Sequence, residues 1–286
     1  MTIGVIGGSG IYELEGLERA RWQKVDSPFG EPSDELLMGE FAGVPVVFLP
    51  RHGRGHRIPP SFINYRANID ALKRAGVTDL LSFSAVGSLK EEIAPGAFVL
   101  VDQFLDRTCG RAGSFFDIGC VGHVPMAKPV CGRLGDAFKA AASVAGMRLI
   151  RGGTHVVIEG PQFSTQAESR LLATQGMSVI GMTNMPEAKL AREAELCYAV
   201  VAMVTDYDSW HPGHDAVTVE QVVTVMKTNI AVARRLLMET LPRLAVRPPL
   251  CPERCDLALD GAIMTAPAAR DPALLKKLGA VAGRVL

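Results

Sequence analysis

Two aspartates, Asp206 and Asp208, follow the strongly apolar run of residues 197–205. Residues i and i+2 of an extended chain face the same way, so both carboxyl groups should point into one space. Two like charges in partly apolar surroundings resist double ionisation, and one of them can keep a proton near neutral pH. Such a pair could act as a general acid or as a hydrogen-bond donor. The plainer interpretation is a strand end with two solvated carboxylates, or with caps for the helix beyond.

A second candidate is the basic segment PRHGRGHRIPP at residues 50–60, which also follows an apolar run. Its cationic side chains are Arg51, His52, Arg54, His56 and Arg57. Arginine presents a planar fork that matches phosphate oxygens, so this density of cations suits a small multivalent anion. A solvated basic loop is the alternative interpretation.

Three further strand ends carry groups that suit an anion. Residues 7–10, with Ser9, form a loop whose amides could hold one, although the segment matches neither G-x-G-x-x-G nor a P-loop. Ser84 lies near the end of the run 79–89, and Thr183 stands just before a helix, whose N-terminus favours anions. Ligands of α/β sheets bind at the carboxyl ends of strands, and the sequence shows neither a Ser-His-Asp order nor a metal-ligand cluster. These features predict a bound phosphate and favour an anion-using enzyme over a binding domain without catalysis.

Composition excludes several other classes of protein. The 286 residues include 30 acidic and 30 basic side chains, which leaves no basic surplus for nucleic acid. No stretch approaches the roughly 18 apolar residues of a membrane span, and the N-terminus lacks a basic leader, so we expect a cytoplasmic protein. Of the six cysteines, Cys251 and Cys255 form a C-x3-C without a second pair of ligands to complete a zinc site. We therefore expect free thiols and no metal.

Strand-like and helix-like segments alternate along the chain. Apolar runs predict strands at 3–8, 44–51, 79–89, 97–106, 155–161, 178–182 and 197–205. Helices are expected at 63–76, 133–146, 186–196 and from about 218 to 241. This pattern predicts an α/β fold in which residues 1–243 form a single domain, with a mixed, largely parallel β-sheet flanked by helices. Residues 244–286 are expected to form a C-terminal arm, whose last helix begins at Asp271 and Pro272.

Nine segments give the chain a resemblance to a known family: GGSG, RHGRGHRIPP, NYRANI, SAVGSL, DQFLDRT, HVPMAKP, EGPQFSTQAES, GMTNMPEAKLARE and VTDYDSW. In this order, from about residue 3 to residue 242, they resemble the trimeric branch of the purine nucleoside phosphorylase family, and within it the 5'-methylthioadenosine phosphorylases. The resemblance implies a nucleoside phosphorylase-like fold, a homotrimer and a pentosyltransferase of purine and methionine salvage.

The resemblance also implies roles for residues at matching positions. Phosphate would be bound by Ser9, Arg51, His52, Ser84, the amide of Ala85 and Thr183. Asp206 and Asp208 would be the catalytic pair and would hydrogen-bond adenine at N7 and the 6-amino group. Other nucleoside contacts would come from Met182, Phe163, His56 and, from a neighbouring subunit, His123. Ser164 and Val219 would shape specificity.

The implied reaction is phosphorolysis of 5'-methylthioadenosine to adenine and 5-methylthioribose 1-phosphate. Phosphate would be a cosubstrate, and neither a cofactor nor a nucleic-acid or membrane partner is expected. Family members that act on 6-oxopurines generally carry Asn and Glu where this chain has Asp206 and Ser164, so these two residues favour a 6-aminopurine. 5'-Deoxyadenosine is a plausible second substrate. The alternatives are a phosphorylase of methylthioinosine or another purine nucleoside, and a purine-binding protein without catalysis.

Overall fold

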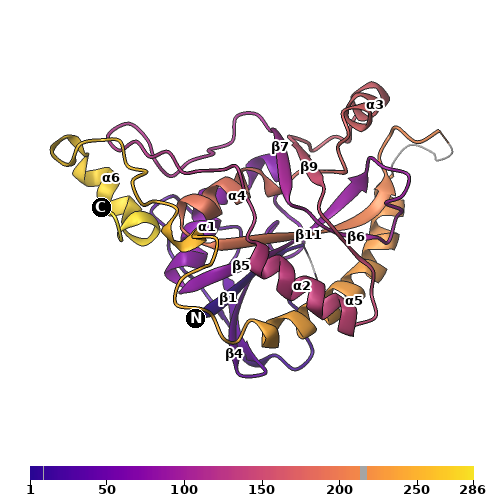
Figure 1. Cartoon of the computed structure of the whole chain (residues 1–286), viewed down its shortest axis with the longest axis horizontal. Helices are drawn as coiled ribbons and strands as arrows, with labels where there is room; N and C mark the ends of the chain where they lie inside the picture. The colour runs from indigo at the N-terminus through magenta and orange to yellow at the C-terminus, as the bar shows by residue number, and fades with distance from the viewer. Residues whose placement is uncertain (9, 213–217) are drawn as a thin grey trace.

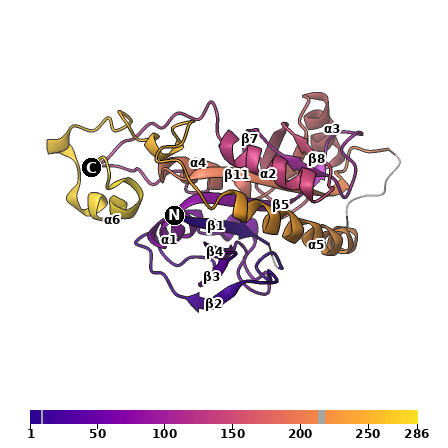
Figure 2. The same ribbon diagram turned by 60° about the horizontal axis from the view of Figure 1, so that its bottom comes forward.

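A mixed sheet of eleven strands forms the centre of the computed structural model, which describes residues 1–8, 10–212 and 218–286. Strand β5 (Val77–Ser88) lies in the middle, parallel to β1 (Thr2–Gly7) on one side and to β11 (Cys197–Tyr207) on the other. Beyond β1 the sheet continues through β4 (Val44–Pro50), β3 (Leu36–Phe41) and β2 (Glu18–Gln23). Figure 2 shows these indigo strands together at the N-terminal side of the molecule.

The other half of the sheet branches from β5 and β11. The last residues of β5 pair with β10 (Val179–Gly181), which leads to β9 (Thr154–Ile158) and β7 (Gln103–Arg107). Strand β11 pairs with β6 (Phe98–Leu100), which pairs in turn with β8 (Leu149–Arg151). The carboxyl ends of β5, β10 and β11 therefore come close together, where α/β sheets bind ligands.

Helices cover both faces of this sheet (Figure 1). On one face α2 (Gly132–Val144) packs against α5 (Val219–Arg243), and on the other α1 (Tyr65–Arg74) packs against α4 (Asn184–Glu193). The predicted α/β fold, with a largely parallel sheet between helices, is confirmed. Within the described residues, no helix combines the length and the apolar character that crossing a membrane requires.

Strand β11 explains why both faces must be covered. Its residues 197, 199, 201 and 203 lie in the core beneath α2 and α5, and residues 198, 200, 202 and 204 lie in the core beneath α1 and α4. Side chains alternate across a strand, so a continuous apolar run presents two apolar faces. The run CYAVVAMVT therefore anchors the centre of the sheet.

Several elements differ from the sequence prediction. The single strand expected at 97–106 is divided into β6 and β7, because Asp102 pairs with Gly153 and directs the chain to a different neighbour. Strands β2, β3 and β8 were not predicted, nor was α3 (Gln166–Thr174), which a Thr165–Glu168 capping box begins. β2 is almost wholly exposed at the sheet edge, so it lacks the apolar alternation that marks a strand.

The last 43 residues, 244–286, run from the end of α5 to α6 (Pro272–Ala282) at the far end of the molecule from α3 (Figure 1). The side chain of Asp271 caps α6 by accepting a hydrogen bond from the amide of Ala273, as predicted. Leu274, Leu278 and Val281 are buried in the core that α1 and α4 share, so this segment packs on the rest of the chain. The division into a domain of 1–243 and an arm of 244–286 stays our proposal.

Candidate active site

Several of the predicted site residues gather around the second half of β5. The amide of Arg51, directly after β4, donates to the carbonyl of Gly7 at 2.9 Å, and this contact joins the glycine loop to the basic segment. Ser9 lies outside the described residues. The Arg51 Nη1 group donates to the carbonyl of Phe83 at 2.9 Å, one residue before Ser84. The ends of β1 and β4 therefore meet β5 at the position where the sequence predicts an anion.

Ser84 and Thr183 form the clearest part of this anion pocket. Their hydroxyl oxygens are 3.1 Å apart, although the residues are separated by 99 positions in the chain. Thr183 is the N-cap residue of α4, but its hydroxyl makes no capping bond and so faces Ser84. Both side chains are largely buried. Two buried hydroxyls with the amide of Ala85 beside them suit the oxygens of an anion.

Arg51 is buried in an ion pair with Glu187. Its Nε–H donates to Oε2 of Glu187 at 2.7 Å, and its Nη2 donates to Oε1 of Glu187 at 3.1 Å and to the hydroxyl of Ser82 at 2.6 Å. Because a guanidinium has five N–H donors, one hydrogen of Nη1 lacks a partner among the described residues. The guanidinium of Arg51, which the sequence suggested as a phosphate ligand, is thus directed mainly at the carboxylate of Glu187.

Glu187 belongs to a buried network that the sequence did not reveal. Tyr198 donates its hydroxyl to Glu187 Oε1 at 2.7 Å. Asn184 donates to the hydroxyls of Ser82 and Tyr198, each at 3.0 Å. These groups come from β5, α4 and β11, and none of them adjoins Arg51 in sequence. The network fixes the guanidinium from behind, so that only a small part of it can face the pocket.

His52 has a defined proton arrangement. Its Nδ1 lies 2.8 Å from the carbonyl of Ile58, so Nδ1 must carry the hydrogen and donate it. Burial lowers the pKa of His52 to about 4, with smaller contributions from the charges of Arg51 and His56, although the Ile58 carbonyl raises it. The neutral ring therefore keeps a free lone pair on Nε2. His56 is exposed and stacks on His52 with ring centroids 4.2 Å apart.

The other two arginines of the basic segment have different partners. Arg54 binds Asp34 at 2.8 Å and Glu35 at 3.0 Å, and its guanidinium lies over the ring of Trp22. Arg57 donates to the carbonyl of Ser33 at 2.8 Å. Arg54 and Arg57, which were not among the residues expected to bind phosphate, are thus bound by acidic and carbonyl groups at residues 33–35.

Asp206 and Asp208 lie together over Gly87 of β5. A Cβ atom at Gly87 would come within 3.0 Å of Asp206 Oδ2 and within 3.2 Å of Asp208 Cβ. The register of β11 on β5 shifts between Val204 and Asp206, which is where the aspartates leave the regular ladder. Absence of a side chain at Gly87 leaves the space that Asp206 Oδ2 and Asp208 Cβ border, so the two aspartates lie on the same side of this residue.

The two carboxyl groups have raised pKa values. Burial raises the pKa of Asp206 to about 6, and the charge of Asp208 raises it further, although a 2.6 Å hydrogen bond from the Thr205 hydroxyl opposes this. Burial also raises the pKa of Asp208, and the hydroxyls of Ser169 and Ser164 lie near enough to lower it. Those hydroxyls and Asp208 Oδ2 are nevertheless buried without a hydrogen bond of ordinary geometry. The free site thus holds polar groups that a ligand could satisfy.

Met182 is fixed from two sides. Its sulfur lies where a Cβ at Gly160 would clash with it, so the glycine, with φ of +66°, permits a very close approach. Arg111 donates to the carbonyls of Met182 at 2.7 Å and Met185 at 2.8 Å, and to the carbonyl of Glu159 at 2.7 Å. Arg111 therefore joins the segments before α3 and α4. Arg111 was not predicted as a site residue, because nothing in its neighbourhood in sequence signals these long-range contacts.

Two predicted residues are exposed, and a third lines a separate pocket. Phe163 and Val219 are exposed, with relative exposures of 43% and 68%. His123 lines a separate pocket of about 460 Å³ with Lys189 and Glu193, and its amide donates to the carbonyl of Ala262 in the C-terminal segment. Among the described residues, the group suited to a metal ion consists of four cysteines and includes none of the predicted site residues.

The anion pocket and the aspartate pair are spaced along one strand. Ser84 and Gly87 are three residues apart on β5, or about 10 Å at 3.3 Å per residue. Hydroxyl and guanidinium donors thus lie at one end of this stretch, and two carboxyl groups of raised pKa lie at the other. A ligand that spans both ends would carry an anionic group at one end and hydrogen-bonding groups at the other.

The chain is similar to known phosphorylases in sequence and in structure. The sequence profile of the phosphorylase superfamily matches residues 2–242. The chain is 61% identical over 284 residues to the S-methyl-5'-thioadenosine phosphorylase of Cereibacter sphaeroides, covering 99% of this chain and 98% of that protein. It is 62% identical over 285 residues to the protein of the same name from Bradyrhizobium diazoefficiens, covering 100% and 98%.

Two solved structures have the same fold. A methylthioadenosine phosphorylase from an Antarctic soil metagenomic library superposes with a TM-score of 0.92 at 42% identity, covering 98% of each chain. The methylthioadenosine phosphorylase of Schistosoma mansoni, solved with adenine, superposes with a TM-score of 0.86 at 35% identity, covering 92% of this chain and 99% of that one. Both similarities extend over nearly the whole chain.

Proposed function

Because the chain belongs to the phosphorylase superfamily, we propose that it is a pentosyltransferase that cleaves 5'-methylthioadenosine with inorganic phosphate. The products are adenine and 5-methylthioribose 1-phosphate, which places the protein in purine and methionine salvage. The observation that carries this proposal is the placement of an anion pocket and a carboxyl pair about 10 Å apart on β5. A nucleoside with phosphate beneath its sugar matches that separation.

The anion pocket binds phosphate in this proposal. The hydroxyls of Ser84 and Thr183, the Ala85 amide and the remaining Nη1 hydrogen of Arg51 supply donors, and Ser9 adds another from the adjoining loop. His52 has its hydrogen on Nδ1, so its Nε2 accepts the O–H of hydrogen phosphate. This contact fixes which phosphate oxygen carries the proton and leaves the unprotonated oxygens to face the sugar.

The carboxyl pair binds the base. Asp206, whose pKa is raised to about 6 by burial, gives a proton or a strong hydrogen bond to N7 of adenine, and Asp208 accepts from the 6-amino group. As the bond from C1' to N9 breaks, its electron pair stays on the base, and a phosphate oxygen forms the new bond to C1'. The protons balance because hydrogen phosphate releases its own proton to solvent when it becomes the monoester dianion, and solvent returns one proton to Asp206, so that adenine gains one proton overall.

Further residues contact the sugar and determine specificity. Met182, held by Gly160 and Arg111, lies against the ribose and base, and Phe163 stacks near the base. Ser164 lies beside the Asp208 carboxyl and leaves room that a larger acidic residue would fill. The methylthio group meets His56 and the neighbouring subunit's His123 in a homotrimer, with Val219 at the edge. His123 lines a pocket apart from this chain's own aspartates, which supports a role across a subunit boundary.

The scope of the reaction is part of the proposal. A pocket that accepts a methylthio group also admits hydrogen, so 5'-deoxyadenosine is proposed as a second substrate. Phosphate is the cosubstrate, and the chemistry above requires no metal or organic cofactor. A cytoplasmic location is likewise our proposal.

The test is phosphate-dependent release of base from 5'-methylthioadenosine, 5'-deoxyadenosine, adenosine, inosine and methylthioinosine. We expect the highest kcat/KM with 5'-methylthioadenosine and no release without phosphate. Asp206→Asn should reduce kcat/KM for the adenine nucleosides much more than for the 6-oxopurines, because an amide cannot protonate N7 of adenine but can still donate to N7 and O6 of a 6-oxopurine. Absence of release from every nucleoside would refute the enzyme, and a preference for methylthioinosine would establish the 6-oxopurine alternative.

A further inference from the structure

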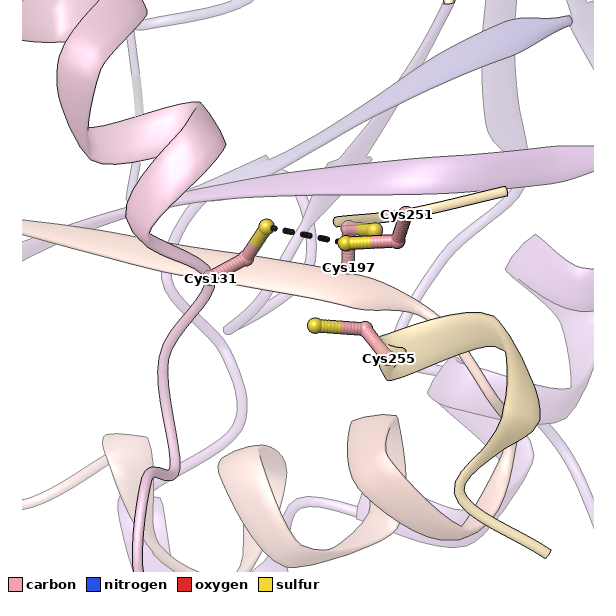
Figure 3. Close-up of side chains that lie close together, drawn as sticks. All are labelled: Cys131, Cys197, Cys251 and Cys255. Carbon is pink, nitrogen blue, oxygen red and sulfur yellow. Dashed lines mark hydrogen bonds between the residues drawn. The ribbon is translucent and has the colours of Figure 1, made fainter. Parts of the chain in front are cut away.

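Four cysteine thiols meet in the interior, away from the aspartates. They belong to Cys131, Cys197, Cys251 and Cys255, and their sulfur atoms all lie within 4.8 Å of one another. Each side chain is at most 2% exposed. Figure 3 shows the four sulfurs gathered around one common space. The C-x3-C spacing of Cys251 and Cys255 gave no second pair of ligands in sequence, but the fold supplies it from residues 54 or more positions earlier.

The four cysteines come from three separate parts of the chain. Cys131 is the N-cap residue of α2, Cys197 is the first residue of β11, and Cys251 and Cys255 precede and begin a short 3-10 turn in the C-terminal segment. All four thiols are free. The cluster therefore combines two parts of the chain. Cys131 and Cys197 belong to the sheet and its helices, and Cys251 and Cys255 belong to the C-terminal segment that packs on them.

The sulfur spacing fits a tetrahedral metal ion. A zinc–sulfur bond of about 2.3 Å places the corners of a regular tetrahedron about 3.8 Å apart. The Cys131 and Cys251 sulfurs are 3.7 Å apart, and the largest separation in the group is within 4.8 Å. Small side-chain movements would equalise these distances. A closed set of four sulfurs without solvent access is the donor set of a structural zinc site, whereas catalytic sites keep an open position.

The surroundings hold the ligands in place and balance charge. Glu253, between the two arm cysteines, accepts a hydrogen bond at 2.6 Å from the amide of Gly132, next to Cys131. Asp256 accepts from the amide of Cys251 at 2.9 Å and binds Arg247 at 2.9 Å. Nη2 of Arg247 also lies 3.8 Å from the sulfur of Cys197. Arg247 thus places a donor and a positive charge beside a thiolate, as in the outer shell of metal sites, whereas the two carboxylates hold the backbone next to Cys131 and at Cys251.

We propose that Cys131, Cys197, Cys251 and Cys255 bind one zinc ion, which fastens the C-terminal segment to the starts of α2 and β11. Binding converts four thiols into four thiolates and releases four protons, so the zinc centre carries a net charge of −2, beside the guanidinium of Arg247. Soft thiolates select zinc over hard cations such as magnesium. The site is structural and takes no part in the proposed phosphorolysis.

The segment that zinc fastens also reaches the His123 loop. Residues 258–263 follow Cys255 closely, and within them Ala262 accepts the hydrogen bond from the amide of His123, while Ile263 bridges to Gly122. Zinc would therefore order the loop that carries His123 as well as the segment itself. Loss of zinc is expected to expose residues 244–286 first, before the sheet unfolds.

The first test is the metal content of the full-length protein, purified under reducing conditions without chelator and analysed by mass spectrometry of the elements. We expect one zinc per chain. Exchange for cobalt(II) should give the intense absorption of a tetrahedral tetrathiolate, which a merely packed group of thiols would not produce. Neither measurement requires a variant that might fail to fold.

The second test uses matched cysteine variants. Cys251→Ser and Cys255→Ser should each lower bound zinc at least about tenfold and make residues 244–286 sensitive to protease, since a ligand has been lost. Cys109→Ser is the control, because Cys109 is exposed and outside the cluster, and it should keep its zinc. The proposal is overturned if the reduced wild-type protein takes up no zinc when it is supplied, if it holds iron instead, or if the cluster is found as disulfides that bind no metal after reduction.

Discussion

Arg51 and Glu187 form a two-point ion pair in the interior, with Nε to Oε2 at 2.7 Å and Nη2 to Oε1 at 3.1 Å. They are 136 residues apart in sequence, and Glu187 is fully buried. Removing one partner of a buried pair leaves an uncompensated charge, which is much more costly than the pair itself. Arg51 thus depends on Glu187 for its position beside the anion pocket.

Glu187→Gln tests this dependence. We expect a loss of about 3 kcal/mol in the free energy of unfolding, because the Arg51 charge stays buried without a counterion. The KM for phosphate should rise by about tenfold, through loss of orientation, while the KM for the nucleoside changes less. Urea denaturation and steady-state kinetics with each substrate varied give the two quantities.

Glu40→Gln is the matched control for that variant. Glu40 pairs with Arg19 at 3.1 Å on the surface, where the arginine is 77% exposed, so the stability change should be at most about 1 kcal/mol. A lower KM for phosphate in Glu187→Gln would contradict the positioning role, since it would mean that Glu187 restrains Arg51 from the anion.

The raised pKa of Asp206 predicts the pH dependence of catalysis. If the protonated carboxyl is needed at N7, kcat/KM for the nucleoside should be constant at low pH and fall as the pH rises through about 6. Asp206→Asn should remove that part of the profile, because the amide does not titrate. A wild-type profile that stays flat from pH 5 to pH 8 would argue against Asp206 as the acid.

The same pKa predicts an effect on stability. Burial raises the pKa of Asp206 from an ordinary value of 3.8 to about 6, so the folded state favours the protonated carboxyl. The stability that this group contributes is fully present below about pH 3.8 and is lost as the pH rises through about 6. Relative to the wild type, Asp206→Asn should therefore gain stability between these values. Urea denaturation at pH 4.5, 6 and 7.5 measures the difference, and a gain that does not vary with pH would refute this explanation.

Gly87→Ala tests the space over β5. The new methyl group would lie 3.0 Å from Asp206 Oδ2 and 3.1 Å from Cγ2 of Ile180, so the carboxylates must move. We expect kcat/KM for the nucleoside to fall at least about tenfold, because a shift of about 1 Å in positioning groups can cost a hundredfold. Gly279→Ala in α6 is the control, since an added Cβ there meets nothing within 4 Å. Equal activity in the two variants would show that the space is not needed.

Sequence patterns predicted best the parts of the fold in which local chemistry decides the structure. The runs around Ile3 and Val200 are apolar on both faces. A strand of this kind must be covered on both sides, so it was expected in the middle of the sheet. β2 could not be found in this way, because its polar side chains face solvent at the sheet edge. The helix α6 was predicted from Asp271, whose capping bond involves a residue only two positions away.

The candidate site was predictable by residue type but not by partner. Asp206 and Asp208 were predicted from their own spacing, and Ser84 and Thr183 from their places at a strand end and before a helix. The pairing of Arg51 with Glu187, the contacts of Arg111 and the meeting of four cysteines all depend on long-range packing. Spacing in the chain carries no information about such contacts. The proposed zinc ligands are spread from residue 131 to residue 255, so they form no motif that can be recognised in the sequence.

The register shift between Val204 and Asp206 divides β11 into two parts with different tolerance to change. Before the shift, neighbouring residues belong to opposite cores, so one inserted or deleted residue would exchange the two faces and disrupt folding. After it, Asp206, Tyr207 and Asp208 contribute no side chain to either core. If Asp206 and Asp208 bind the base as proposed, substitutions at this tip would change the purine preference while the sheet keeps its fold. In this fold, substrate specificity could therefore evolve through substitutions at the carboxyl end of β11 without loss of the core.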